Sequence, residues 1–176
     1  MRKVNRTWMA AVAAALLLGT LVGAVWARPG DRTQAQATTR KVTLAGGDFV
    51  PNNPTVNWYN SGYRVECATG ACLFTAPVVF PTQSSVTVER IRLHVADYDG
   101  VEFAEAQLGR ANPSAGSLTL LGVAQSPVGT TSGVQTYSSP AINKAVWPSH
   151  KAQIWLSIGA PGIYVYGVTV EYHVNS

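Results

Sequence analysis

The chain has 176 residues and carries 13 Lys and Arg against 9 Asp and Glu, and only 12% of its residues are charged. Three of the basic residues precede residue 7, so the rest of the chain is close to neutral. This near-neutral balance argues against nucleic-acid binding, which requires a clustered basic surface, and we expect no nucleic-acid partner. The scarcity of charge also leaves few groups for acid–base catalysis.

The first 27 residues have the pattern of a secretory signal peptide. Basic residues within positions 2–6 precede an apolar run from Met9 to Val25, and Val25-Trp26-Ala27 forms a cleavage site. Ala35-Gln36-Ala37 offers a second site further along. Because the apolar run is also long enough to span a bilayer, an uncleaved anchor with an outward-facing domain is the alternative. We expect a secreted, extracellular protein without membrane contact after cleavage at Ala27.

The next segment, residues 28–39, is small and polar without periodicity, and we predict a flexible leader there. From residue 40 to residue 176, segments with a period of two alternate with turn signals such as Gly46-Gly47-Asp48, which is typical of an all-β domain. The segment Phe74–Phe80 alternates in this way. Pro77 within it favours the edge of a sheet or a bulge.

The two cysteines, Cys67 and Cys72, are separated by a short segment that contains a glycine. In an oxidising compartment such a pair predicts a disulfide across a tight turn, and two free buried thiols are the alternative. A zinc site would need further ligands, and His94, His150 and His173 do not have zinc-ligand spacing. We therefore expect no metal and no cofactor.

A long strand is predicted over Ser85–Ala96. Its apolar residues change phase between Val88 and Ile91, so one residue is inserted near Glu89-Arg90. An inserted residue of this kind predicts a β-bulge.

The turn Asp97-Tyr98-Asp99-Gly100 leads into a predicted strand over Val101–Arg110, and another strand is predicted over Ser117–Ala124. Asp97 and Asp99 match part of a calcium-loop pattern, but the terminal glutamate of that loop is missing. Ordinary turn chemistry accounts for the same two residues. The pattern leaves calcium binding at this turn open.

The last two strands, residues 152–158 and 164–174, alternate most regularly. Their apolar faces are predicted to lie in the core, with four central members: Ile154, Leu156, Val168 and Val170. About eight to ten strands in a chain of this length predict a two-sheet antiparallel β-sandwich of the jelly-roll type.

From residue 85 to residue 174 the order of features resembles an uncharacterised jelly-roll-like β-sandwich module of secreted bacterial proteins. The shared parts are the strand Val86–Ala96, the turn Asp97–Gly100, the strand end Leu108-Gly109-Arg110 and the segment Tyr166–Tyr172. That module often has an aspartate before its penultimate strand, where this chain has Val146-Trp147-Pro148. The resemblance implies a β-sandwich and brings no catalytic residues with it.

The sequence contains no pattern typical of a catalytic triad. It lacks a Gly-x-Ser-x-Gly motif. His94 falls on a strand among arginines, His150 in a turn and His173 near the end of the chain, and we interpret all three as solvated and unpartnered. Catalytic groups generally need a partner that perturbs their pKa. We predict no catalytic residue, and an extracellular hydrolase with an unrecognised site is the alternative.

Four aromatic residues are candidates for ligand binding. Trp155 lies on the polar face of its strand, between Gln153 and Ser157, whereas Trp58-Tyr59 and Trp147 fall in predicted loops. Exposed flat rings on a β-sandwich are typical of sugar-binding sites, where a ring stacks on a pyranose. The alternative is that a neighbouring loop or the leader covers Trp155, since tryptophans are highly buried on average.

These features predict a secreted, non-catalytic protein with a structural or protein-interaction role, and they allow self-association into a homo-oligomer. The first alternative is a carbohydrate-binding module that uses the four aromatic residues, and the second is the hydrolase. The partner is accordingly an unknown protein or a polysaccharide. At the start of the last strand, Ile163 and Val165 alternate with Tyr164 and Tyr166, so this segment is either covered on both faces or lies at an interface.

Overall fold

The computed structural model describes residues 38–53 and 55–175. The predicted signal peptide and all but the last two residues of the predicted leader lie outside this part of the chain. The first strand begins at Arg40, the residue at which we expect the domain to start. Across these described residues, no helix has the length and apolar character needed to cross a membrane.

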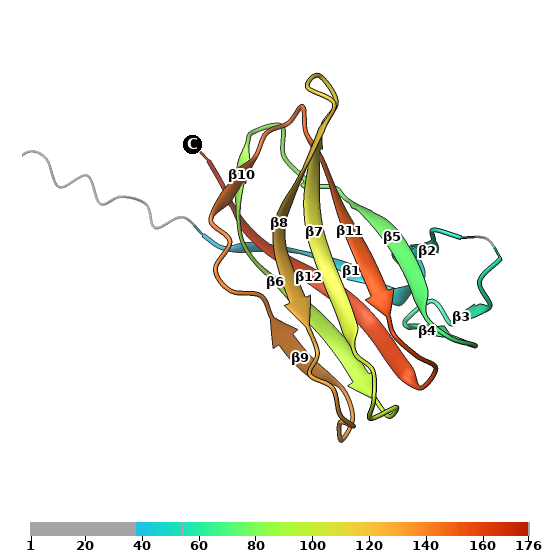
Figure 1. The fold of residues 1–176 in the computed structure, drawn as a ribbon. Coiled ribbons are helices and arrows are strands. Elements are labelled where there is room, and N and C mark those ends of the chain that lie inside the picture. The colour runs from blue at the N-terminus through green and yellow to red at the C-terminus, as the bar shows by residue number, and fades with distance from the viewer. Residues whose placement is uncertain (1–37, 54, 176) are drawn as a thin grey trace, which may run out of the picture. The chain divides into compact units, whose positions relative to one another are not determined.

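The strands form two antiparallel sheets that face each other (Figure 1). The seven-stranded sheet contains β1 (Arg40–Ala45), β3 (Trp58–Asn60), β4 (Val65–Cys67), β6 (Val86–Asp97), β9 (Gln135–Ser138), β10 (Lys144–Val146) and β12 (Ile163–Val174). The five-stranded sheet has the order β2-β5-β11-β7-β8, with bounds Val50–Pro51, Cys72–Val78, Lys151–Ile158, Ala104–Asn112 and Ser117–Gln125. A short 3₁₀ turn, η1 (Gly46–Asp48), follows β1. The predicted two-sheet β-sandwich is confirmed.

The hydrophobic core lies between the two sheets. Along β11 every second residue is buried, as a strand with one face on the core requires. The four residues predicted to be central to the core are each 0% exposed: Ile154, Leu156, Val168 and Val170. The alternate residues of the same strands therefore form the two outer faces of the sandwich.

The predicted bulge is present in the pairing of β6 with β12. Arg90 pairs with Glu171 and Val88 with Tyr172, so Glu89 is the extra residue on β6. Val88 and Ile91 are three residues apart, so on a regular strand they would point to opposite faces. The inserted Glu89 brings both of them to the core side. The change of phase in the sequence was thus a correct sign of a bulge.

Cys67 and Cys72 form the predicted disulfide, with their Cα atoms 5.9 Å apart. The bond joins the end of β4 in one sheet to the start of β5 in the other, and both cysteines are buried. Pro77 is also placed as predicted: β2 pairs only with Phe74 and Thr75 of β5, so β5 is the sheet edge at Pro77.

Candidate functional site

Trp155 lies on the outer face of the five-stranded sheet, in the middle of β11. Its ladder neighbours are Thr75 on β5 and Gln107 on β7. The indole extends diagonally over Gly109 of β7, where an added Cβ would overlap Cζ3 and lie 2.7 Å from Cη2. The indole can lie against the sheet because Gly109 has no side chain. Trp155 remains half-buried in this position, so it is not covered over.

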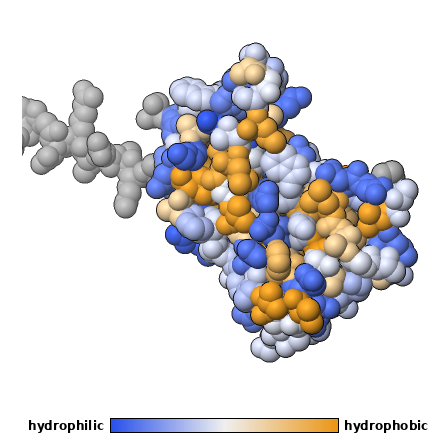
Figure 2. Space-filling view, viewed as in Figure 1, coloured by the Kyte–Doolittle hydropathy of each residue, from blue (hydrophilic) through white to orange (hydrophobic). Residues whose placement is uncertain are grey.

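The outer face around the indole is hollowed into an open pocket of about 330 Å³, which we call the Trp155 pocket. Four adjacent strands line it: Leu73 of β5, Trp155 and Ser157 of β11, Glu105 and Gln107 of β7, and Leu118 and Leu120 of β8. Figure 2, drawn from the same side as Figure 1, shows hydrophobic residues over β8 beside polar residues on this face. A mainly apolar pocket with a few convergent polar groups is the usual form of a ligand site.

The polar side chains of the pocket can form hydrogen bonds with a ligand. The Nε2 of Gln107 donates to Glu105 Oε1 at 2.6 Å, which orients both side chains. Gln107 retains a second N–H and a carbonyl oxygen, and Ser157 adds a hydroxyl. Glu105 is the single carboxylate among the lining residues, and no lining residue is basic. Glycoside hydrolysis requires a pair of carboxylates, so the pocket has the parts for binding and lacks those for this reaction.

Two of the other predicted binding residues belong to the opposite sheet. Trp58 and Tyr59 are in strand β3, so their predicted position in a loop is wrong. The strand was missed because it has only three residues and pairs with the equally short β4. Trp58 packs edge-on against Phe74, with ring centroids 5.6 Å apart, and is part of the core packing. Tyr59 points outward and is 62% exposed.

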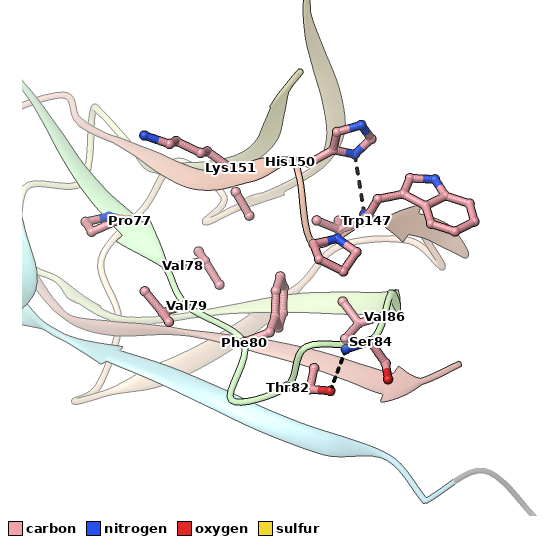
Figure 3. Close-up of a pocket in the computed structure, with 13 residues that line it drawn as sticks. Pro77, Val78, Val79, Phe80, Thr82, Ser84, Val86, Trp147, His150 and Lys151 are labelled. Carbon is pink, nitrogen blue, oxygen red and sulfur yellow. Dashed lines mark hydrogen bonds between the residues drawn. The ribbon is translucent and has the colours of Figure 1, made fainter. Parts of the chain in front are cut away.

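Trp147 lies at a second pocket of about 340 Å³, between the β5–β6 loop and the β10–β11 turn (Figure 3). The predicted turn is confirmed by the hydrogen bond from the N–H of His150 to the carbonyl of Trp147, 2.9 Å long. In Figure 3 the ring of Phe80 stands in the middle of this pocket, and the indole of Trp147 lies to one side. The two pockets share no lining residue, so the structure does not bring Trp147 to Trp155.

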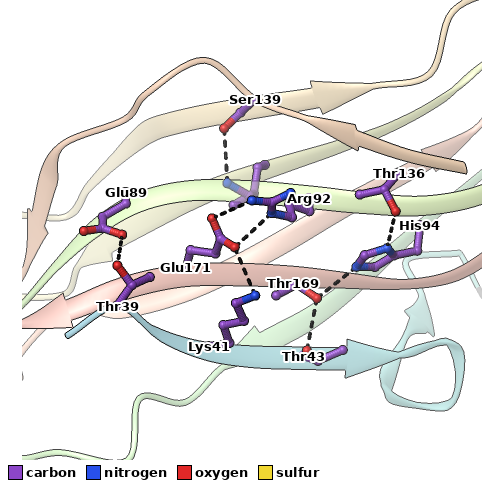
Figure 4. Close-up of polar contacts among 11 residues, drawn as sticks. Thr39, Lys41, Thr43, Glu89, Arg92, His94, Thr136, Ser139, Thr169 and Glu171 are labelled. Carbon is purple, nitrogen blue, oxygen red and sulfur yellow. Dashed lines mark hydrogen bonds and ion pairs between the residues drawn. The ribbon is translucent and has the colours of Figure 1, made fainter.

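The outer face of the seven-stranded sheet carries a network of polar side chains (Figure 4). Glu171 is buried and accepts from Arg92 Nε at 2.9 Å and Nη2 at 3.3 Å, and Lys41 Nζ lies 3.4 Å from its Oε1. Burial favours a higher pKa for the Glu171 carboxyl. The hydrogen bonds and positive charges of Arg92 and Lys41 together outweigh burial, so this pKa lies below its ordinary value.

His94 lies on the same face and has its own hydrogen-bond partners, so its interpretation as unpartnered is wrong. Its Nδ1 lies 2.9 Å from Thr136 Oγ1, and its Nε2 lies 3.0 Å from Thr169 Oγ1. Thr169 in turn is 3.0 Å from Thr43 Oγ1. Partial burial, followed by the charge of Arg92, lowers the pKa of His94 below its ordinary value. Sequence reasoning missed these contacts because they join four strands, β1, β6, β9 and β12, that are far apart in the chain.

His173 and His150 also have partners, but neither forms a triad. His173 Nδ1 lies 3.1 Å from Glu89 Oε1, and Thr39 Oγ1 donates to Glu89 Oε2 at 2.9 Å. A triad places the histidine between the hydroxyl and the carboxylate, whereas here the carboxylate is in the middle. The Nδ1 of His150 accepts from the N–H of Trp147 at 3.4 Å.

One oxygen of each carboxylate of Asp97 and Asp99 bonds to their own turn, whereas Asp97 Oδ2 is buried without a hydrogen-bond partner among the described residues. Asp97 Oδ1 accepts from the N–H of Asp99 at 3.0 Å, and Asp99 Oδ2 accepts from the N–H groups of Val101 and Glu102 at 3.1 and 2.9 Å. This is the hydrogen bonding that stabilises a tight turn. In the part of the chain that the structure describes, no cluster of three or more His, Cys, Asp and Glu could hold a metal.

Of the residues that line the Trp155 pocket, the sequence identified Trp155 alone as a binding residue, and it did not identify Leu73, Glu105, Gln107, Leu118, Leu120 and Ser157. Alternation along the strand does place Glu105 and Gln107 on one face of β7. It does not say that β7 is the strand beside β11, because that pairing joins residues distant in the chain. Sequence reasoning therefore identified the aromatic residue without its surroundings.

No protein-family model matches the sequence, and no curated protein is similar to it. Among solved structures the chain is similar to the C-terminal carbohydrate-binding module CBM6 of a marine laminarinase from Zobellia galactanivorans, at 17% identity and a TM-score of 0.47, over 74% of this chain and 98% of that one. It is similar to the carbohydrate-binding module CBM36 in complex with calcium and xylotriose, at 12% identity and a TM-score of 0.46, over 74% and 98%. It is also similar to the xylan-binding module CBM15, at 16% identity and a TM-score of 0.47, over 80% and 99%. At these scores the similarity identifies neither a family nor a ligand for this chain.

Proposed function

We propose that the protein binds a neutral carbohydrate chain on the outer face of the five-stranded sheet, with Trp155 as the stacking platform. The position of Trp155 carries this proposal, because the indole lies over Gly109 in an open pocket instead of in the core. An indole in that position can stack against the apolar face of a sugar ring. Gln107 and Ser157 lie beside it and can bond to the hydroxyl groups of the ring.

The charge of the pocket favours a neutral sugar over an acidic one. Glu105 is the only charged residue that lines the Trp155 pocket. A uronate or sulfate group would meet a like charge there without a cation to offset it. Hydroxyl groups, by contrast, can donate hydrogen bonds to the carboxylate, and such charge-assisted bonds are strong.

The extent of the pocket favours a chain over a single sugar. It is lined by β5, β11, β7 and β8, which are adjacent in the sheet. Four strands about 4.8 Å apart give a floor of roughly 14 Å, which is longer than one pyranose ring. The pocket is open to solvent, so a chain can pass through it without ending there.

The proposal is tested with two variants that each remove one tryptophan. Binding is measured by calorimetry with cellohexaose, xylohexaose and laminarihexaose as neutral probes and polygalacturonate as the acidic probe. We expect Trp155→Ala to weaken binding of the preferred neutral probe about 30-fold, the ~2 kcal/mol typical of a central aromatic residue. Trp147→Ala is the matched control, since Trp147 is 55% exposed and lies outside the pocket, and it should bind normally.

Two results would contradict the proposal. If Trp147→Ala loses binding and Trp155→Ala retains it, the ligand occupies the other pocket. If the unaltered protein binds polygalacturonate more tightly than every neutral probe, Glu105 does not select against acidic sugars.

A further inference from the structure

We infer that the free edge of β8 pairs with the same edge of a second copy of this chain, so that the protein forms a two-fold symmetric dimer. β8 is the last strand of the five-stranded sheet, and its ladder is with β7 alone (Figure 1). The backbone N–H and C=O groups on the outer side of an edge strand are a template for a further strand.

The other edge strands in the described residues are short or charged, or they contain a proline, as β5 does at Pro77, beyond its pairing with β2. β2, at the opposite edge of the same sheet, has two residues and includes Pro51. β10, β3 and β9 have three, three and four residues, and β1 begins with Arg40 and Lys41. Short length, proline and basic side chains are the usual features that prevent pairing at an edge. β8 has nine residues and contains neither proline nor charge.

The surroundings of β8 also favour contact with an identical surface. No Asp, Glu, Lys, Arg or His occurs from Ala111 to Asn143, so β8 and its flanking loops bring no like charges together; Arg110, the β7 partner of Thr119, donates to the carbonyl of Ala145 in its own copy. Leu118 and Leu120 are 62% and 54% exposed. Hydrophobic residues gather over β8 in Figure 2. The edge from Ser117 to Leu120, ahead of a bulge at Leu121, is apolar, neutral and exposed at the same time.

The sequence of β8 is self-complementary about Thr119. In an antiparallel pair, Thr119 of one copy can lie opposite Thr119 of the other. Leu118 of each copy then lies opposite Leu120 of the other copy, which gives two leucine pairs. Directly opposite residues lie on the same face with their Cβ atoms about 4.5–5.5 Å apart, so all four leucines become contacts. The same patch serves both copies, so the assembly closes as a dimer.

Pairing through β8 joins the two five-stranded sheets into one. Opposite residues in an antiparallel ladder share a face, so both Trp155 pockets lie on the same side of the joined sheet. A long polymer could then contact two pockets of one dimer, which raises its effective affinity. The dimer itself does not depend on the proposed function, because it rests on the edge strand alone.

Sedimentation equilibrium of the purified protein tests the dimer. We expect the unaltered protein to sediment as a dimer and Thr119→Lys to sediment at about half that mass, because like charges at the two-fold axis separate the copies. Val128→Lys is the matched control: Val128 is 59% exposed in the loop after β8, and the variant should remain dimeric. An unaltered protein that is monomeric, or a Thr119→Lys variant that remains dimeric, overturns the inference.

Cross-linking tests the register independently of the lysine variants. Under oxidising conditions Thr119→Cys should form a covalent dimer, since the two cysteines face each other across the axis. In Ser117→Cys the two cysteines would be four residues out of register, about 13 Å apart, which no disulfide can span. Equal cross-linking of the two variants, or none in Thr119→Cys, contradicts the pairing. Sugar binding by monomeric Thr119→Lys shows separately whether the Trp155 pocket functions.

Discussion

The two outer faces of the sandwich differ in what their side chains contact. On the seven-stranded sheet, Arg92 and Lys41 both bond to Glu171, and His94 lies between two threonines. On the five-stranded sheet, Trp155 lies over a glycine, and Leu118 and Leu120 project into solvent.

The comparison shows that polarity alone does not distinguish a binding face from a structural one. The seven-stranded sheet carries more charge on its outer face, but its charges are largely used within the sheet itself. The five-stranded sheet has fewer polar groups on its outer face. Beside them lies the indole of Trp155, which stacks on no other aromatic ring of the described residues. We therefore expect changes on the first face to alter stability and changes on the second to alter binding.

The largest expected effect is on the core that both faces share. Leu156 follows Trp155 in β11 and is 0% exposed, because successive residues of a strand point to opposite faces. Leu156→Ala should lower the free energy of unfolding by ~2–5 kcal/mol, measured by denaturant titration. Sugar affinity of the folded variant should stay normal. A cost below about 0.5 kcal/mol would show that the assignment of faces along β11 is wrong.

A smaller loss of stability is expected from Glu171→Gln on the seven-stranded sheet. The variant removes the charge that Arg92 and Lys41 bond to, and it should cost about 1–2 kcal/mol, since both partners are partly solvated. The pKa of Glu171 is lowered in the folded state, so its contribution is present above the ordinary value and is lost as pH falls through the folded-state pKa. The gap in unfolding free energy between the two proteins should therefore shrink in acid. A gap that widens in acid would contradict this, and sugar affinity should be unchanged throughout.

The smallest change is a single methyl group on the five-stranded sheet. Gly109→Ala places a Cβ where the indole of Trp155 lies, and the ring must move away from the sheet. Because the indole is half-buried and can move outward, we expect a stability loss of about 1 kcal/mol, at the low end of overpacking costs, and a clear loss of sugar affinity. Gly116→Ala in the β7–β8 loop is a control for added volume without a clash, although its positive φ adds local strain. Normal affinity in Gly109→Ala would show that the position of the ring does not matter.

Much of the fold could be predicted because it follows from alternation along single strands. The core residues of β11, the core residues Val168 and Val170 of β12 and the bulge at Glu89 are properties of one segment and its phase. The phase of β12 changes again between Val165 and Gly167, so that Ile163 and Val165 lie in the core, and this shift was not predicted. The disulfide between Cys67 and Cys72 joins residues close in the chain. Closeness in the chain brings the two cysteines together, and alternation along a strand sets the face to which each core side chain points.

The short strands and the histidine contacts could not be predicted in this way. β3 has too few residues to show a period, so Trp58 and Tyr59 were placed in a loop. The contacts of His94 with Thr136 and Thr169 join β6 to β9 and β12. Those contacts depend on which strands lie side by side, and alternation contains no information about neighbours.

The sequence by itself determined that the described chain is an all-β sandwich, that Ile154, Leu156, Val168 and Val170 lie in its core, and that Trp155 faces outward. Only the tertiary structure decided that Gly109 lies under that indole, that Gln107 and Glu105 stand beside it, and that β8 is left at an edge. The physical reason is the range of the interactions. The direction of a side chain follows from the pleat of its own strand, whereas a binding surface is assembled from strands whose order is set by long-range pairing.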